Sequence, residues 1–265
     1  MQIVDDWCDW LRAGGAAEST VTLRRKTLSS LVTHANTTLE AIAPMDLARW
    51  LGSQRASWTR STYYRGATAF YTWLELTGQR ADNPGAMLPR PRNPRGVPQP
   101  IETAVLQRML LTPTSGRSLA YITLAAFAGL RVHEIAKMHT ADVEGAWIRV
   151  VGKGGHTAMV PMHERVQRLA QGYSQSRYWF PGRVDGHVGS GSVSRVIKAA
   201  MIRAGAPATA HAHSARHWYG TELMRATGDL RVVSELMRHA NIQSTVGYTY
   251  VADDRRRQAI EKLRA

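Results

Sequence analysis

The sequence predicts a mainly α-helical protein that also contains a small β-sheet. Three observations support this fold class: apolar residues recur at helical spacing over most of the chain, two short β-patterned segments flank a glycine-rich turn, and a proline-rich segment separates two helical regions. Apolar residues make up 44% of the 265 residues. This fraction is enough to bury a sizeable core, so a wholly disordered chain is excluded.

The clearest boundary in the chain is the segment Leu88–Pro100, with the sequence LPRPRNPRGVPQP. Its five prolines exclude a continuous helix or a central strand. We therefore expect a first domain at residues 1–88, a basic linker at residues 89–100 and a second domain from residue 101. The linker carries Arg90, Arg92 and Arg95. Two interpretations are open for it: a solvated, stiff spacer, or a basic strap across a nucleic-acid backbone.

Helical spacing of apolar residues predicts a small four-helix first domain. The second helix has Ser19 or Thr20 as a candidate N-cap, the third follows Pro44, and Gly78 stops the fourth. The aromatic residues of the fourth helix recur at helical spacing, so we expect them in the core rather than on a base-stacking surface. The predicted helices are Val4–Ala13, a helix from the Ser19 or Thr20 cap to about His34, Met45–Ser53 and Arg60–Thr77.

The polar residues of these helices are mostly basic or hydroxylated. Hydroxyl and guanidinium groups at helix starts commonly position nucleic-acid phosphates, so we expect a DNA-binding surface here. The alternative is ordinary helix capping beside a solvated face. The basic candidates for phosphate contact in this domain are Arg24, Arg25, Lys26, Arg60 and Arg65, and hydroxyl groups near them belong to Thr20, Thr22, Ser57, Thr59, Ser61 and Thr62.

The second domain is predicted to combine helices with a β-hairpin. Trp147–Val151 and Thr157–Pro161 have the pattern of paired strands, and Gly152–Gly155 forms the turn between them. The longest apolar stretch, Leu119–Leu130, falls short of the about 18 residues of a membrane span and indicates a buried helix. The predicted helices are Glu102–Leu111, Ser118–Phe127, Val132–Met138, Glu164–Gln171, Ser192–Ala204, His217–Thr227 and Leu230–Arg238.

The chain is strongly basic, with a formal charge of +14 and a pI near 10.6. The excess is +4 over residues 1–100 and +10 over residues 101–265, so it is not confined to a tail. This charge favours a polyanionic partner, and nucleic acid is the first candidate. The single cysteine, Cys8, excludes a disulfide framework. The N-terminus lacks the pattern of a signal peptide, so we expect a cytoplasmic protein without a membrane partner.

Four short segments of the second domain carry residues suited to chemistry on a phosphate. They contain, in order, Arg131, then Lys153 in the hairpin turn, then His213 and Arg216 in the pattern His-x-x-Arg, and finally His239 followed by Tyr248. Each segment alone is weak evidence for a catalytic site, because an isolated arginine or lysine is usually an ion-pair or turn residue.

A cluster of histidines raises the alternative of a metal site. Its members are His211, His213, His217 and His239. The H-E-x-x-H pattern of a zinc site is missing, and there is no second cysteine to serve as a ligand. We therefore expect neither a metal nor another cofactor.

Taken together and in this order, the six residues resemble the active-site set of the tyrosine recombinase, or phage integrase, family. The resemblance covers essentially the whole chain and is densest in its second half. It implies an N-terminal helical core-binding domain of SAM-like fold and an α+β catalytic domain at residues 101–251. It also implies double-stranded DNA attachment sites as substrate, a homotetramer on DNA, an accessory directionality factor as partner, and a location near the nucleoid of a bacterial host.

The resemblance assigns the main steps of DNA cleavage to three residues. Tyr248 is the nucleophile, which attacks the scissile phosphate and leaves a 3′-phosphotyrosyl link and a free 5′-hydroxyl. Arg131 and Arg216 clamp the non-bridging oxygens, a task for which the planar fork of arginine is better suited than lysine. The implied function is site-specific DNA recombination that integrates or excises a mobile element such as a phage genome.

The remaining residues of the set assist in the same reaction. The resemblance implies that Lys153 protonates the leaving 5′-oxygen, that His213 assists proton movement at the tyrosine hydroxyl, and that His239 hydrogen-bonds the phosphate. Glu134 matches an acidic residue that orders the site. Because a phosphotyrosyl ester keeps the energy of the broken bond, religation needs no ATP.

The sequence departs from the family pattern at two positions and offers one rival nucleophile. Ala215 stands where leucine is usual before the second arginine, and we expect it to alter core packing. Arg238 stands where glycine usually precedes the histidine, and we expect it to add positive charge near the site. Tyr250 is a second candidate nucleophile, but the spacing from His239 favours Tyr248.

The two ends of the chain carry further expectations about how the protein works. The chain begins directly with the first helical domain, so we expect a short form without a separate arm-binding module, for which core sites suffice. The tail at residues 252–265 fits either a frayed terminal helix or a helix that docks on a neighbouring protomer.

Two alternative functions remain open. The protein could be a type IB topoisomerase that relaxes supercoils as a monomer, or a non-catalytic DNA-binding regulator of the same fold.

Overall fold

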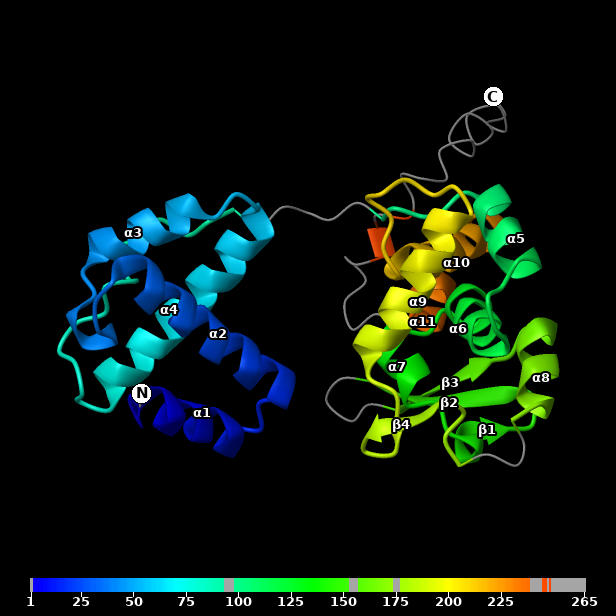
Figure 1. Ribbon diagram of the computed structural model, residues 1–265, viewed down its shortest axis with the longest axis horizontal. Helices are drawn as coiled ribbons and strands as arrows, with labels where there is room; N and C mark the ends of the chain where they lie inside the picture. Colours follow the sequence, from blue (N-terminus) through cyan, green and yellow to red (C-terminus); the bar gives the residue numbers. More distant parts are fainter. Residues whose placement is uncertain are drawn as a thin grey trace, which may run out of the picture. The chain divides into compact units, whose positions relative to one another are not determined.

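The computed structural model describes residues 2–92, 98–152, 157–173 and 177–238, together with residues 245, 246 and 248. The chain divides into two compact units, Met1–Arg95 and Gly96–Ala265, and each is described by itself (Figure 1). Both units are mainly helical, and the second contains a small antiparallel sheet, so the predicted fold class is confirmed. Among the described residues, no helix is both long and apolar enough to cross a lipid bilayer.

In its described part, the first unit consists of four α-helices and one 3₁₀ turn. They are α1 (Gln2–Ala13), α2 (Glu18–Ala35), the turn Leu39–Ala41, α3 (Pro44–Ser53) and α4 (Ser57–Leu76). Helix α2 packs against each of the other three helices (Figure 1). The predicted aromatic core is confirmed: Phe70, Tyr71 and Trp73 of α4 are buried, and Trp7 meets Phe70 edge to face at 5.1 Å.

The starts of two helices in the first unit differ from the sequence prediction. Helix α2 begins at Glu18, so Ser19 and Thr20 lie inside its first turn, and the N-cap position is Ala17, which makes no side-chain hydrogen bond. A carboxylate is favourable at a helix N-terminus, and that of Glu18 is also held by Arg12 at 2.7 Å, which accounts for the earlier start. Helix α4 likewise begins at Ser57 rather than Arg60.

The described part of the second unit contains seven α-helices arranged around α6. They are α5 (Thr103–Leu111), α6 (Gly116–Phe127), α7 (Val132–Ala136), α8 (Glu164–Gln171), α9 (Ser190–Arg203), α10 (His213–Thr227) and α11 (Leu230–Leu236). Helix α6 contacts α5, α7, α8, α9 and α10 (Figure 1). Almost every α6 residue from Ser118 to Ala126 is buried, so the prediction of a buried helix in this apolar stretch is confirmed.

The sheet of the second unit is built on the predicted hairpin. Strands β1 (Val143–Glu144), β2 (Trp147–Val151) and β3 (Thr157–Pro161) pair antiparallel in the order β1-β2-β3. Ile148 lies opposite Val160, and both are buried in the core. Residues 153–156 of the predicted turn lie outside the described residues. Strand β1 and a further short strand, β4 (Pro181–Val184), were not predicted, because such short segments carry no readable alternation.

Helix α10 begins at His213, about one turn before the predicted start at His217. The preceding turn shows no apolar period, because its buried positions are filled by Ser214, Ala215 and Arg216 rather than by large apolar residues. Ala215 is fully buried in the core of the unit. The extra turn places the His213 and Arg216 side chains on the same helix.

Candidate active site

Arg131 lies in the turn between α6 and α7, directly before the first residue of α7. Its backbone N–H donates to Oε2 of Glu134 at 2.7 Å, and its guanidinium donates to Oε1 at 2.9 Å. Burial alone would raise the pKa of Glu134, but the charge of Arg238, the Arg131 N–H and the Arg131 guanidinium hold that pKa below its usual value. The ionised carboxylate therefore fixes both the backbone and the side chain of Arg131.

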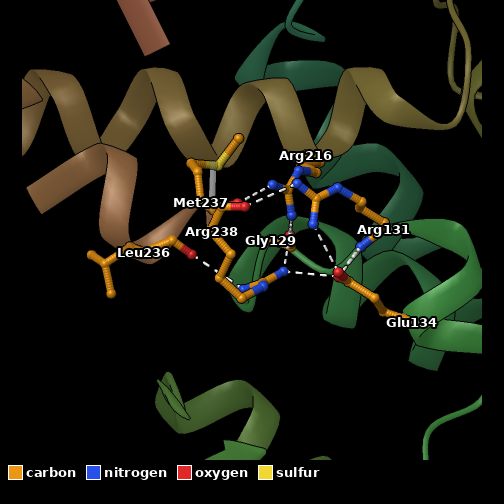
Figure 2. Close-up of polar contacts among 7 residues, drawn as sticks. All are labelled: Gly129, Arg131, Glu134, Arg216, Leu236, Met237 and Arg238. Atoms are coloured by element: carbon orange, nitrogen blue, oxygen red, sulfur yellow. Dashed lines mark hydrogen bonds and ion pairs between the residues drawn. The ribbon is translucent and has the colours of Figure 1, made fainter. Parts of the chain in front are cut away.

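The turn that carries Arg131 depends on Gly129. This glycine has a φ of +57°, in the left-handed region that residues with a side chain rarely adopt. A Cβ at this position would also lie 2.4 Å from the ring of Tyr219 on α10. The chain can therefore reverse direction after α6 and present the Gly129 carbonyl to two guanidinium groups (Figure 2).

Arg216 joins three segments of the second unit. From α10 it donates through Nη1 to the carbonyl of Gly129 and through Nη2 to the carbonyl of Met237, just after α11 (Figure 2). The residue is 4% exposed. Burial, followed by repulsion from Arg131 and Arg238, lowers the pKa of this guanidinium to about 9, so it stays cationic at neutral pH. A crowded, buried cation favours an anionic ligand, because a negative charge relieves the repulsion.

The ring of Tyr248 occupies a buried position beside α10. It packs with Met224, Val233 and Met237 in a small apolar cluster. Gly220 of α10 makes room for it, since a Cβ on that residue would approach a Tyr248 ring carbon to 2.8 Å. The tyrosine is thus held against the same helix that carries Arg216.

The hydroxyl of Tyr248 lies among cationic and imidazole groups. Its oxygen is 2.8 Å from Nδ1 of His217. Burial raises the pKa of Tyr248 to about 12, while the charges of Arg216 and Arg131 act in the opposite direction. The hydroxyl is therefore protonated at neutral pH and lies within electrostatic range of both arginines.

The imidazole in contact with this hydroxyl belongs to His217, whereas the resemblance implied that His213 assists proton movement there. The ring centroid of His211 lies 6.2 Å from that of His213 and 5.9 Å from that of His217. Burial, followed by the proximity of His211 and His213, lowers the pKa of His217 to about 4. His217 is therefore neutral at pH 7, and in the tautomer with its proton on Nε2 it accepts the hydroxyl hydrogen through Nδ1.

We expect the second unit to lose stability as the pH falls below about 6.5, the ordinary histidine value. The pKa of His217 is about 4 in the folded chain and close to its ordinary value in the unfolded chain, so the unfolded state binds the proton first. The full contribution of neutral His217 to the free energy of unfolding is present above the pKa that it has in the unfolded chain. It is lost as the pH falls from that value to the pKa in the folded chain. At about pH 5 the free energy of unfolding should fall by about 2 kcal/mol from this group alone.

Urea unfolding of the second unit at about pH 7.5 and about pH 5 measures this effect. Burial also lowers the pKa values of His133 and His213, which act in the same direction. His217→Asn should weaken the pH dependence. Equal free energies of unfolding at the two pH values would contradict the assignment.

Several predicted site residues lie outside the described part of the chain. They are Lys153, His239, the rival Tyr250, the linker residue Arg95 and the tail at residues 252–265. Of the six predicted catalytic residues, the structure therefore places Arg131, His213, Arg216 and Tyr248, all in the second unit. The contact of His217 with Tyr248 was missed, because the sequence offered that histidine only as a metal ligand.

The predicted DNA-binding residues of the first unit have different surroundings. Arg25 forms an ion pair with Asp5 at 2.6 Å. Arg60 donates to the carbonyls of Leu51 and Gln54 at the end of α3. Both guanidinium groups thus support the fold of this unit, and Lys26, also on α2, is exposed.

Arg24 and Arg65 lie close together, the first on α2 and the second on α4. Nη1 of Arg24 lies 2.9 Å from the position that a Cβ of Gly66 would occupy, so this glycine leaves room for the guanidinium. Burial, followed by the charge of Arg65, lowers the pKa of Arg24. Two neighbouring like charges favour an anion between them.

A groove of about 440 Å³ lies along α4 beside Arg65. Aromatic rings, hydroxyl groups and two guanidinium groups line it, and the hydroxyl and guanidinium groups are of the kind that contact nucleic-acid phosphates. Arg90 at the start of the linker segment is one of the two arginines, and both Arg90 and Arg92 are exposed. The lining residues are Trp10, Tyr64, Arg65, Thr68, Ala69, Thr72, Trp73, Leu76 and Arg90.

Solved structures share the fold of this chain. A lambda integrase (75–356) dimer bound to a COC′ core site matches 91% of this chain and 95% of its own with a TM-score of 0.75, at 14% identity. The XerH site-specific recombinase bound to a palindromic difH substrate matches 98% of this chain and 83% of its own with a TM-score of 0.71, at 16% identity. The chain thus has the fold of these recombinases.

Sequence comparison gives the family. The phage integrase family model matches residues 101–255. The integrase from mycobacterium phage Brujita is 40% identical, with 99% of this chain and 92% of its own covered and a TM-score of 0.53. The tyrosine recombinase XerC of Erythrobacter litoralis is 32% identical over 257 residues, which cover 89% of this chain and 83% of that protein. The chain belongs to the phage integrase family of tyrosine recombinases, as its sequence predicted.

The match to some relatives is shorter. The tyrosine recombinase XerC of Xanthomonas campestris pv. campestris is 31% identical over 195 residues. These residues make up 69% of this chain and span 61% of the length of that protein.

Proposed function

We propose that this protein is a site-specific DNA recombinase that cleaves and rejoins DNA through a 3′-phosphotyrosyl intermediate. The observation that carries the proposal is the meeting of Arg131, Arg216 and Tyr248, which come from distant parts of the sequence. Two guanidinium groups near a tyrosine hydroxyl supply the fixed charge and the nucleophile that phosphodiester cleavage requires.

In the proposed cleavage step, the Tyr248 oxygen bonds to the scissile phosphorus while the bond from phosphorus to the 5′-oxygen breaks. The tyrosine proton passes to a neutral imidazole, for which His217 at 2.8 Å is the candidate in contact and His213 the one suggested by the resemblance. Lys153 gives a proton to the departing 5′-oxygen. A 5′-hydroxyl reverses the step by attacking the phosphotyrosyl ester.

Arg131 and Arg216 hold the non-bridging oxygens in this proposal, and His239 adds a hydrogen bond to the phosphate. Both arginines retain N–H donors beyond those used in the described contacts, because a guanidinium has five. As charge builds up on the non-bridging oxygens, fixed cations in a water-poor site stabilise the transition state more than the ground state.

The biological reaction we propose is integration or excision of a mobile element such as a phage genome. When the attacking 5′-hydroxyl comes from another duplex, religation becomes strand exchange. The relative that supports this assignment is the phage Brujita integrase, with 40% identity over nearly the whole chain. Double-stranded DNA attachment sites are the proposed substrate.

The active assembly we propose is a homotetramer on DNA, directed by an accessory factor. One of the structures with the same fold is a lambda integrase tetramer bound to a Holliday junction, with a TM-score of 0.72. In this assembly the first unit grips the core site through its basic residues, and the linker arginines Arg90, Arg92 and Arg95 contact the backbone.

We expect Arg65→Gln to weaken DNA binding about tenfold and to lower the salt slope of binding by about one. The reason is that Arg65 and Arg24 repel each other in the free protein, and a phosphate between them removes that repulsion. Gel-shift titrations over a range of salt concentrations measure both quantities. The matched control is Arg12→Gln, because Arg12 already pairs with Asp9 and Glu18. Equal slopes for the two variants would contradict this role for Arg65.

A nicked suicide duplex that contains the attachment site tests the proposed function. After cleavage, the short fragment on the 3′ side of the scissile phosphate, which carries the free 5′-hydroxyl, diffuses away. The covalent adduct then accumulates and is seen on a denaturing gel. A recombinase gives an adduct at one defined site, a topoisomerase gives adducts at many sequences, and a DNA-binding regulator gives none. Adducts at many sequences, or none at all, would overturn the proposal.

A further inference from the structure

Arg238 occupies a backbone position that disfavours an arginine. It follows α11 with a φ of +52°, in the left-handed region, where a residue with a Cβ is strained by about 1 kcal/mol or more. Its side chain is also only 8% exposed, so the guanidinium has lost most of its hydration. Glycine would remove both penalties. A residue that remains under strain in this way points to a compensating role.

The side chain of Arg238 makes contacts that belong to the Arg131 turn. Its Nη2 donates to Oε2 of Glu134 at 2.9 Å and to the carbonyl of Gly129 at 3.0 Å. Its Nη1 donates to the carbonyl of Leu236 at 3.2 Å. Figure 2 shows the guanidinium groups of Arg131 and Arg238 on either side of Glu134.

The charge balance of this cluster depends on Arg238. Glu134 is buried and ionised, and it touches Arg131 as closely as it touches Arg238, at 2.9 Å in both cases. Without Arg238, the carboxylate would cancel the charge of Arg131, and the cluster would keep a single positive charge, that of Arg216. With Arg238 present, three guanidinium groups face one carboxylate, and the cluster keeps two positive charges. A phosphodiester carries one negative charge, and its five-coordinate transition state carries two.

We propose that Arg238 is a positioning residue of the reaction, which neutralises Glu134 and thereby leaves the charge of Arg131 available to the scissile phosphate. The inference rests on the proposed function. Arg238 acts through Glu134 and Arg131 and does not itself touch the substrate. The carboxylate can then orient Arg131 without cancelling its charge.

The backbone of Arg238 has a separate part in the same arrangement. Its carbonyl accepts a hydrogen bond from Nη2 of Arg131 at 3.1 Å. Any residue at position 238 that keeps this backbone conformation keeps the contact, and glycine does so most easily. Substitutions of Arg238 that keep this conformation therefore change how far the Glu134 charge is neutralised, without removing the support of the Arg131 guanidinium.

Three variants separate charge from packing. Arg238→Lys keeps the charge, Arg238→Met keeps a long apolar stem without the charge, and Arg238→Gly removes both and relieves the backbone. The measurements are the single-turnover rate of adduct formation on the suicide duplex and, separately, the affinity for that duplex. Thermal unfolding establishes that each variant is folded at the assay temperature.

We expect Arg238→Met and Arg238→Gly to slow adduct formation about 10- to 100-fold, the usual effect of removing a group that orients a reacting residue. Arg238→Lys should recover much of the rate. Affinity for DNA should change by less than about threefold in all three, because Arg238 acts through Glu134 and Arg131 and makes no phosphate contact of its own in this proposal. The split between rate and affinity, with rescue by lysine, is the signature of the proposed role.

Two results would overturn the inference alone. In one, Arg238→Gly forms the Tyr248-dependent adduct at the wild-type rate. In the other, Arg238→Lys is as slow as Arg238→Met, which assigns the defect to the lost hydrogen bonds of the guanidinium rather than to the lost charge. A wild-type protein that forms no adduct overturns the proposed function, and this inference with it.

Discussion

Tyr248→Phe is expected to abolish the covalent protein–DNA adduct on the suicide duplex. Phenylalanine keeps the ring that packs against Gly220 and the apolar cluster, but it has no oxygen to bond to phosphorus. The change also removes the 2.8 Å hydrogen bond with His217, for which we expect a loss of about 1 kcal/mol in the free energy of unfolding. The adduct is measured on a denaturing gel, and DNA binding by gel shift should be unchanged.

Two other tyrosines provide the controls for this result. Tyr219 lies on α10, and burial raises its pKa as it raises that of Tyr248, so Tyr219→Phe reports what the loss of a neighbouring, partly buried phenol does by itself. Tyr250→Phe tests the rival nucleophile. Both variants should still form the adduct. An adduct that survives in Tyr248→Phe and disappears in Tyr250→Phe would move the nucleophile to the second tyrosine.

The overall fold could be predicted from the sequence where the signal is local. Alternation and a glycine-rich turn predicted the β2–β3 hairpin, and a long apolar stretch predicted the buried helix α6. The predicted starts of α2 and α10 were wrong for the same reason. At both sites the first turn is stabilised by contacts beyond the local pattern: the Glu18 ion pair with Arg12 in α2, and the burial of Ala215 and Arg216 in α10.

The candidate site shows the same limit. The order and spacing of Arg131, Arg216 and Tyr248 predicted that they act together, and the structure places all three in one unit. The partners of those residues could not be predicted. Which histidine reaches the Tyr248 hydroxyl depends on the exact start of α10, and His217 makes the contact. The left-handed conformation of Arg238 likewise depends on how the chain leaves α11, and the sequence pattern does not encode that.

The polar contacts of Arg216 explain how these partners are brought together. The Arg216 guanidinium donates to the Gly129 carbonyl after α6 and to the Met237 carbonyl after α11. Both turns are therefore hydrogen-bonded to α10. Arg131 and Arg238 sit in those two turns and share Glu134. Any loss at Arg216 should therefore affect the charge at the phosphate and the position of the other two arginines at the same time.

Arg216→Lys is expected to slow adduct formation by about a thousandfold or more, in the range of an arginine that stabilises a phosphoryl transition state. An ammonium group keeps a positive charge, but it cannot span the two carbonyls in the fixed geometry of a guanidinium fork. At least one of the two carbonyls, of Gly129 or Met237, then loses a hydrogen bond, although Gly129 keeps a second one from Arg238. We expect a loss of about 1–3 kcal/mol in the free energy of unfolding. Single-turnover adduct formation and urea unfolding measure the two effects.

The two effects can be separated with a control on the same helix. Arg225 lies further along α10, is exposed and pairs with Glu222 at 2.6 Å, so Arg225→Lys should leave both the rate and the stability nearly unchanged. The rates are compared at a temperature where Arg216→Lys is fully folded, so a slow rate then reports lost stabilisation of the transition state. If Arg216→Lys forms the adduct as fast as Arg225→Lys, the bidentate grip on the phosphate is not needed, and Arg216 serves only to hold the turns.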